Sequence, residues 1–269
     1  MYKIAAVTLL AILSGCKDGG EAADVAAGEV GLPILGSGSN DIASVSLEIL
    51  ADSSDDLDVP RDLAFNPDSG DIWIVNQGEE SVTIISNPGT AEQKSTHVGG
   101  NGYGEHFLAK PSGLAFGPNN MATIHDTDQP TQGGATPADF MGPTLWPSKK
   151  AQFDGGHNSH LDMLHHSPSG KGIAHGEDNL YWVFDGDHKS VTMYDFHDDH
   201  NMGGTDHSDG ETAVYGRGDF KGLKNGTPSH LELDKTTELL YIADSGNNRI
   251  AVMDTTSGSR GDQSSPNYD

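Results

Sequence analysis

Short apolar runs alternate with polar turns along most of the chain, and four segments repeat the same order of runs and turns. With Asp62, Gly113, Gly172 and His230 as corresponding positions, the segments are spaced 51, 59 and 58 residues apart. Runs of this length, bounded by Gly, Asp and Asn, are typical of β-strands joined by tight turns. No segment shows a convincing 3.6-residue period, so we expect few helices.

The second run of each segment is its most regular part. These runs cover residues 72–75, 122–124, 180–184 and 240–243. A short carboxylate or amide follows each run at once or one residue later, namely Asn76, Asp126, Asp185 and Asp244. Because such side chains hydrogen-bond to nearby turn backbone, we predict a structural role for all four.

A third strand is predicted in three of the segments, centred on Val82, Val191 and Ile250. The second segment instead carries an insertion at about residues 127–155, in which residues 140–147 are apolar for a loop. This apolar stretch either covers a sheet edge or forms the lip of a ligand site. Small antiparallel sheets cannot bury their faces alone, and stacking them around an axis gives a propeller, so we predict an all-β fold.

Residues 239–250 (Leu-Leu-Tyr-Ile-Ala-Asp-Ser-Gly-Asn-Asn-Arg-Ile) closely resemble the NHL-repeat signature, and residues 228–233 fit its first strand. The resemblance extends over about residues 55–258, and the second segment is its loosest copy. It implies a β-propeller of NHL type. Propellers of this family usually have six blades, whereas four blade motifs are visible here. The chain is therefore a truncated six-bladed ring, a ring with two degenerate blades, or an unusually small ring.

Two flanking segments bear on how such a ring would close. Residues 45–50 alternate apolar and polar side chains, which predicts one more strand. That strand either pairs with the last blade or forms the outer strand of a blade. After Asp254 the chain is small and polar, so the last segment shows no fourth strand of its own.

The N-terminal segment has the features of an export signal. Residues 4–13 follow Lys3, are almost wholly apolar, and are too few to span a bilayer as a helix. Residues 13–16, Leu-Ser-Gly-Cys, resemble the lipobox of bacterial lipoproteins, so we predict lipidation at Cys16, the single cysteine. The alternative is an ordinary signal peptide with a chance cysteine. Lys17 stands where aspartate often signals inner-membrane retention, which favours the outer membrane.

These features define the expected domain organisation. Residues 1–15 are a lipoprotein signal peptide, and residues 16–44, rich in Gly, Ala, Ser and acidic residues, are a flexible acidic tether. Residues 45–269 form the NHL-type propeller. We therefore expect an exported protein that is lipid-anchored in the cell envelope.

Net charge narrows the range of partners. The chain has 40 Asp and Glu against 15 Lys and Arg, a formal net charge of −25. Like-charge repulsion disfavours nucleic acid and anionic membrane surfaces. We expect no nucleic-acid partner, contact with a membrane only through the lipid anchor, and a small molecule or a protein as the ligand.

The chain has 13 histidines, many of them close to carboxylates, in clusters at residues 157–166, 197–200 and 206–210. Imidazole together with carboxylate is a ligand set for Zn²⁺ and similar ions. The first cluster precedes a first strand, a connection that in propellers lies at one end of the central channel. A divalent metal, Zn or Ca, is accordingly predicted at His157, His160, His165 and His230.

Other histidines have structural explanations. His197, His200 and His207 lie in a polar stretch and are predicted to be solvated loop residues. His175 occupies a position that apolar residues fill in the other segments, which predicts a packed histidine at the edge of the core.

Two families of propeller enzymes are similar in part. Peptidyl-hydroxyglycine amidating lyases hold zinc with histidines at the start of innermost strands, and here only His230 has that context. Gluconolactonase-type propellers bind calcium through channel carboxylates and amides, for which Asp62 and Glu232 are the candidates. The chain contains no GxSxG motif, and no thiol remains once Cys16 is acylated, so catalytic residues are not identified.

Two hypotheses about function follow. In the first, the propeller is a ligand- or protein-binding scaffold that carries a structural metal. In the second, it is a metal-dependent lyase or hydrolase that works at the channel mouth through His160, His165 and His230. The first is preferred because no catalytic constellation is complete, and a propeller fold is compatible with both.

Overall fold

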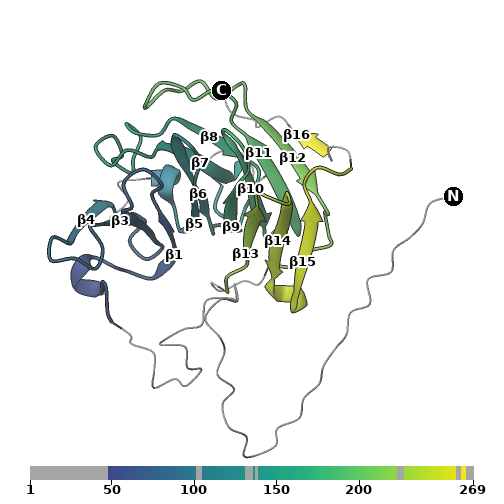
Figure 1. Ribbon diagram of the computed structural model, residues 1–269. Helices are drawn as coiled ribbons and strands as arrows, with labels where there is room; N and C mark the ends of the chain where they lie inside the picture. The colour runs from purple at the N-terminus through teal and green to yellow at the C-terminus, as the bar shows by residue number, and fades with distance from the viewer. Residues whose placement is uncertain are drawn as a thin grey trace, which may run out of the picture. The chain divides into compact units, whose positions relative to one another are not determined.

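Four antiparallel sheets follow one another along the chain in the computed structural model, which describes residues 48–100, 105–130, 136, 139–222, 227–258 and 262–264 (Figure 1). Ile49–Asp269 forms one compact unit. We call the sheets blades 1 to 4 and give their strands from the innermost outward. Blade 1 consists of β1 (Pro60–Phe65), β2 (Ile72–Asn76), β3 (Ser81–Ser86) and β4 (Lys94–Gly99). Blade 2 consists of β5 (Pro111–Phe116), β6 (Asn120–His125), β7 (Met141–Pro147) and β8 (Asp162–His165).

The remaining two blades depart from four strands. Blade 3 consists of β9 (Gly170–His175), β10 (Leu180–Asp185), β11 (Ser190–Asp195), β12 (Glu211–Tyr215) and, paired with β12, β16 (Asp262–Ser264). Blade 4 has three strands in the described part of the chain, β13 (His230–Asp234), β14 (Leu239–Asp244) and β15 (Arg249–Asp254). The described helices are short 3-10 turns, η2 (Ser53–Asp55), η3 (Glu105–Leu108) and η5 (Ser245–Asn247), and none is long and apolar enough to cross a membrane. The predicted all-β propeller architecture is thereby confirmed.

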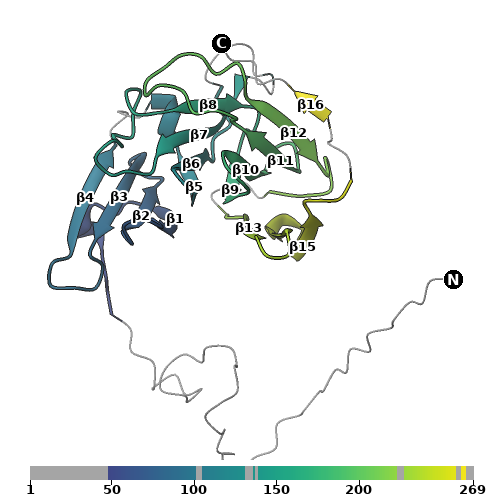
Figure 2. The same ribbon diagram turned by 45° about the horizontal axis from the view of Figure 1, so that its top comes forward.

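The blades are arranged as an arc with their first strands innermost (Figure 2). β1 packs against β5, β5 against β9, and β9 against β13. The backbone NH of Leu114 donates to Oδ2 of Asp62 at 3.0 Å, which ties β5 to β1. Blades 1 and 4 stand at the two ends of the arc.

The inner strands of blades 3 and 4 approach one another closely at Gly172. A Cβ atom at this position would lie 2.7 Å from Nδ1 of His230 and 2.8 Å from its Cα. Real Cβ atoms do not tolerate such distances, and the second of these atoms belongs to the backbone, which cannot simply rotate away. Glycine at this repeat position therefore permits the packing of β9 against β13.

Among the described residues, the hydrophobic core has four clusters, and three of them lie between neighbouring blades. Trp73 of blade 1 packs with Trp146 and Met163 of blade 2, and its ring meets Phe116 edge-on at 5.5 Å. Similar layers join blade 2 to blade 3 and blade 3 to blade 4. Because blades 2 and 3 are covered on both faces, every residue of β7 and β9 is buried. Stacking of blades is thus the main source of stabilisation.

The outer faces of blades 1 and 4, at the two ends of the arc, are partly exposed, unlike the faces between blades. Leu63 and Phe65 of β1 are 56% and 61% exposed, and Ile250 of β15 is 68% exposed. Part of the outer face of blade 1 is covered, since Ala51 and Leu57 pack against its buried isoleucines. Exposed and partly buried residues alternate along most of β15, which marks a sheet with a neighbour on one side only.

Two sequence expectations are corrected. Residues 141–147, taken as part of an apolar loop, are β7, the third strand of blade 2, and pair with both β6 and β8. Residues 48–50, expected at the end of a strand, are not in a strand, and residues 45–47 lie outside the described residues. The insertion in the second segment is therefore shorter than predicted, because it contains a strand.

Candidate functional site

The short polar residue that ends the second strand of blades 1, 3 and 4 is buried and hydrogen-bonds to neighbouring strands and loops. Asn76 donates through Nδ2 to Oγ1 of Thr83 at 2.9 Å. Asp185 accepts from the backbone NH of His188 at 2.9 Å and lies 2.7 Å from Nδ1 of its ring. The Asp244 side chain accepts from the backbone NH of Lys221 at 2.9 Å. The structural role predicted for these three positions is confirmed.

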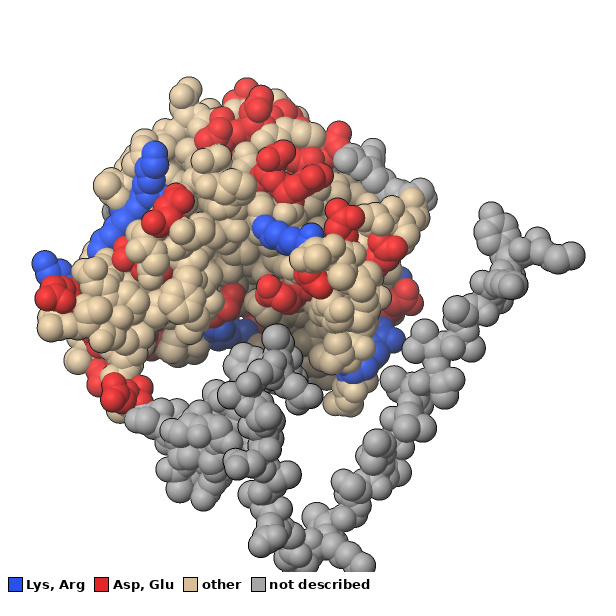
Figure 3. Space-filling view, viewed as in Figure 1, with Lys and Arg blue, Asp and Glu red and all other residues tan. Residues whose placement is uncertain are grey.

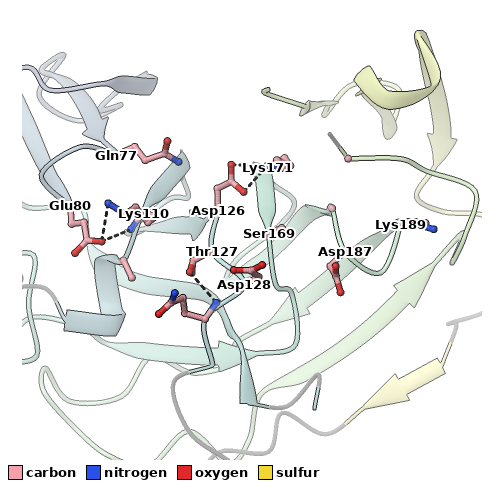
Figure 4. Close-up of a pocket in the computed structure, with 14 residues that line it drawn as sticks. Gln77, Glu80, Lys110, Asp126, Thr127, Asp128, Ser169, Lys171, Asp187 and Lys189 are labelled. Carbon is pink, nitrogen blue, oxygen red and sulfur yellow. Dashed lines mark hydrogen bonds and ion pairs between the residues drawn. The ribbon is translucent and has the colours of Figure 1, made fainter. Parts of the chain in front are cut away.

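Asp126, the corresponding residue of blade 2, forms ion pairs with side chains of the two neighbouring blades. Both of its carboxylate oxygens lie 2.6 Å from Nζ of Lys171 in blade 3 (Figure 4). Its Oδ2 also lies 3.7 Å from Nη1 of Arg61 in blade 1. The carboxylate therefore links charged side chains of three blades, which the sequence repeat did not predict.

This Arg61–Asp126–Lys171 group is buried and carries unequal charge. The side chain of Lys171 is 3% exposed and those of Asp126 and Arg61 are 9% exposed. Neither terminal nitrogen of Arg61 has a hydrogen-bond partner in the described part of the chain. Two cations against one carboxylate leave a net charge of +1, and in a low-dielectric environment that charge acts strongly on its surroundings.

A cavity of about 730 Å³ lies above this group, at the end of the blades where the innermost strands begin. Turns of blades 1, 2 and 3 supply its walls. Its charged lining residues are Glu80, Asp126, Asp128, Asp187, Lys110, Lys171 and Lys189. Gln77, Thr127, Gln129 and Ser169 add uncharged donors and acceptors. Figure 4 labels Gln77, Thr127 and Ser169 among the residues drawn around the cavity. Such a lining suits a polar ligand.

A second cavity, of about 320 Å³, runs along the innermost strands and contains Asp62, His230 and Glu232. Burial raises the pKa of Asp62, and the charge of His230 opposes that rise. These three residues, which the sequence analysis considered separately, thus line one channel. His175 lines it as well and is buried, as predicted, with Nε2 2.9 Å from the Asp178 carbonyl oxygen.

The four histidines predicted to bind a metal lie in different places. His157 and His160, between β7 and β8, are neighbours, with ring centroids 5.2 Å apart and Nδ1 of His160 2.6 Å from the His157 carbonyl oxygen. Burial lowers the pKa of His160 to about 4, so its imidazole is neutral. His165 lies on β8, the outermost strand of blade 2, whereas His230 lies on β13, the innermost strand of blade 4. Metal binding by these residues stays a prediction.

A different group has the spacing of a metal site. One nitrogen or oxygen atom from each of Asp162, His200 and Asp209 lies within 4.8 Å of the others. His207, at the same place, is 1% exposed, so its predicted solvation was wrong, whereas His197 has a side chain 41% exposed, as predicted. The sequence signal was present in the clusters at 197–200 and 206–210, but their partner Asp162 is on another blade.

Comparison with known proteins gives similarity to solved structures only. No protein-family model matches the chain, and no curated protein matches it by sequence. A nidogen–laminin complex matches with 14% identity and a TM-score of 0.47, covering 76% of this chain and 64% of that chain. A catalytically inactive virginiamycin B lyase from Staphylococcus aureus matches with 13% identity and a TM-score of 0.43, covering 73% and 52%.

An auxiliary nutrient binding protein from Bacteroides ovatus matches with 14% identity and a TM-score of 0.44, covering 76% of this chain and 43% of that chain. The chain thus spans less than two thirds of the length of each of these proteins. At such identities and TM-scores, the similarity indicates neither a ligand nor a reaction.

Proposed function

We propose that this chain is a ligand-binding propeller module of the cell envelope, and that its ligand is a small polar molecule that carries a carboxylate. The observation that carries the proposal is the buried Arg61–Asp126–Lys171 group beneath the 730 Å³ cavity. Its excess positive charge stands out in a chain of net charge −25, whose acidic side chains gather at the top of the face in Figure 3. Over the whole cavity, four carboxylates balance the three lysines and Arg61, so the excess positive charge is confined to the floor, where it favours an anionic group of the ligand.

The rim of the cavity supplies the direct contacts. Lys110 and Lys189 are exposed, so their ammonium groups are free to move toward a bound carboxylate. Lys110 has one acidic neighbour, Glu80, at 3.7 Å. The amide and hydroxyl side chains between these lysines suit the hydroxyl groups of a sugar acid. Binding therefore combines charge at the rim and floor with hydrogen bonds along the walls.

Calorimetric titration of the full chain with sugar acids and with the matching neutral sugars tests this proposal. We expect binding of the acid and at least ~10-fold weaker binding of the neutral sugar, a difference of about 1.4 kcal/mol. Lys189→Gln is expected to weaken acid binding by a similar factor. Lys94→Gln, an exposed lysine on β4 away from the cavity, is the matched control. Equal binding of acid and neutral sugar, or an equal effect of the two variants, would contradict the proposal.

The metal and the anchor belong to the same proposal. Among the described residues, no histidine lines the 730 Å³ cavity, so we assign a divalent metal to the scaffold and not to a reaction in this cavity. Export and lipidation at Cys16 are proposed from the lipobox-like residues 13–16, which lie outside the described residues. The acyl chains would hold the module at the outer membrane.

A further inference from the structure

The connection between β11 and β12, residues 196–210, reaches across to the outer strand of blade 2 (Figure 1). Nε2 of His200 lies 2.9 Å from Oδ1 of Asp209 in the same connection. It also lies 3.6 Å from Oδ2 of Asp162 at the start of β8. The three side chains therefore converge between two blades, away from both cavities described above.

Asp162 supplies an independent sign that a cation belongs here. Its side chain is fully buried. Its Oδ1 accepts from the backbone NH of Met163 at 2.6 Å and lies 2.7 Å from Nδ1 of His207. Its Oδ2, on the side of His200, has no hydrogen-bond partner among the described residues. A buried carboxylate oxygen without a hydrogen-bond partner is costly, and a metal ion would satisfy it.

We propose that Asp162, His200 and Asp209 bind one Zn²⁺ ion that fastens blade 2 to blade 3. One imidazole nitrogen and two carboxylate oxygens suit Zn²⁺, which accepts three protein ligands with a water molecule completing the tetrahedron. Ca²⁺ fits less well, because it requires six to eight oxygen ligands. His207 acts as a positioning residue, since its hydrogen bond to Oδ1 orients the Asp162 carboxylate so that Oδ2 faces the ion.

This site is distinct from the predicted set of His157, His160, His165 and His230, none of which belongs to the triad. Its ligands come from strand β8 and from the β11–β12 connection, which share no sheet. A bound ion would therefore add a cross-link between two blades that already share apolar packing and the Asp126–Lys171 ion pair. Because the ion binds only the folded arrangement, it should raise the free energy of unfolding with the logarithm of the ratio of Zn²⁺ concentration to Kd.

Thermal unfolding of the full chain, stripped with EDTA and then titrated with Zn²⁺, tests the site. At a Zn²⁺ concentration about 100 times Kd, we expect the midpoint to rise by roughly 5 °C or more, with about one Zn²⁺ bound per chain by mass spectrometry. Ca²⁺ at the same concentration is expected to give no such shift. Co²⁺ in place of Zn²⁺ should give the visible absorption of a tetrahedral N/O site.

His200→Gln and Asp209→Asn are the test variants, because both residues have solvent access and neither change empties the core. Both are expected to abolish the Zn²⁺-dependent shift and the bound zinc, while the EDTA-stripped midpoint changes little. His197→Gln, an exposed histidine of the same connection, is the matched control and should keep both. The proposal is overturned if Zn²⁺ does not shift the wild-type midpoint, or if the test variants bind Zn²⁺ like the control.

Discussion

At the scale of single residues, both proposed binding sites depend on buried charged side chains whose hydrogen bonds are incomplete. Arg61 and Asp162 each keep polar atoms unsatisfied within the described residues, one beneath a cavity and one between blades. Their residue types were visible in the sequence, but their burial was not. Burial depends on what other blades place against a side chain, and neighbouring residues in the sequence do not reveal it.

His125 of β6 gives a prediction about pH at this scale. Its side chain is fully buried, and Nδ1 donates to the Gly142 carbonyl oxygen at 2.9 Å. Burial lowers the pKa of His125 to about 4, whereas in the unfolded chain it is 6.5. Between these values only the unfolded state binds the proton, so stability falls as the pH is lowered. From pH 7 to pH 5 this residue alone should remove about 2 kcal/mol of unfolding free energy.

Urea unfolding at pH 7 and at pH 5 measures this loss. His125→Asn keeps a side-chain NH donor and does not titrate. The variant should therefore lose about 2 kcal/mol less unfolding free energy between pH 7 and pH 5 than the wild type. Other buried histidines, such as His166, keep part of the dependence in both proteins. An identical pH dependence in the variant and the wild type would show that His125 does not contribute.

At the scale of elements, strand positions were predictable where local signals were strong. The second strands are recognisable because their aliphatic and aromatic runs end at a turn-forming Asp or Asn, and β2, β10 and β14 contain the predicted residues. β7 was missed because it contains Gly142, Pro143 and Pro147 and is buried on both faces, so it lacks alternation. β8 was missed because its residues read as part of a polar, histidine-rich connection.

The close contact of inner strands gives a prediction for Gly172. Gly172→Ala would place Cβ 2.8 Å from Cα of His230, so β9 and β13 must move apart. Overpacking of this kind costs about 1–3 kcal/mol. Gly70→Ala, where φ is +74° and nothing lies within 4 Å, is the comparison and should cost only the left-handed strain of about 1 kcal/mol. Chemical unfolding measures both, and an equal loss in the two variants would contradict the packing argument.

At the scale of the whole molecule, the four blades form an arc whose end faces carry exposed apolar side chains, among them Phe65 and Ile250. Within the arc, each blade is stabilised by its neighbours, as in repeat proteins. The four-blade count predicted from the repeats agrees with the four sheets. The repeats could not show that β16 would join blade 3 and not blade 4, because that pairing joins strands distant in the sequence.

The proposed anchor leads to a prediction about the location of the chain. Cys16→Ser should abolish incorporation of radiolabelled palmitate and move the chain from the membrane fraction to the soluble fraction, since the acyl chains supply its membrane affinity. Lys17→Ala keeps the cysteine and is the control. Membrane association that persists in Cys16→Ser would contradict lipid anchoring.

By itself, the sequence determined the repeat and most of the strands and turns, because these depend on local hydrogen bonding and side-chain pattern. The close approach of the inner strands at Gly172 became visible only in the structure. The tertiary structure alone decided which polar residues meet. Asp126 meets Arg61 and Lys171, and Asp162 meets His200 and Asp209, across distances of tens of residues. Those contacts depend on how the blades stack. Stacking is driven by burial of apolar side chains, and this driving force depends little on which polar side chains are brought together.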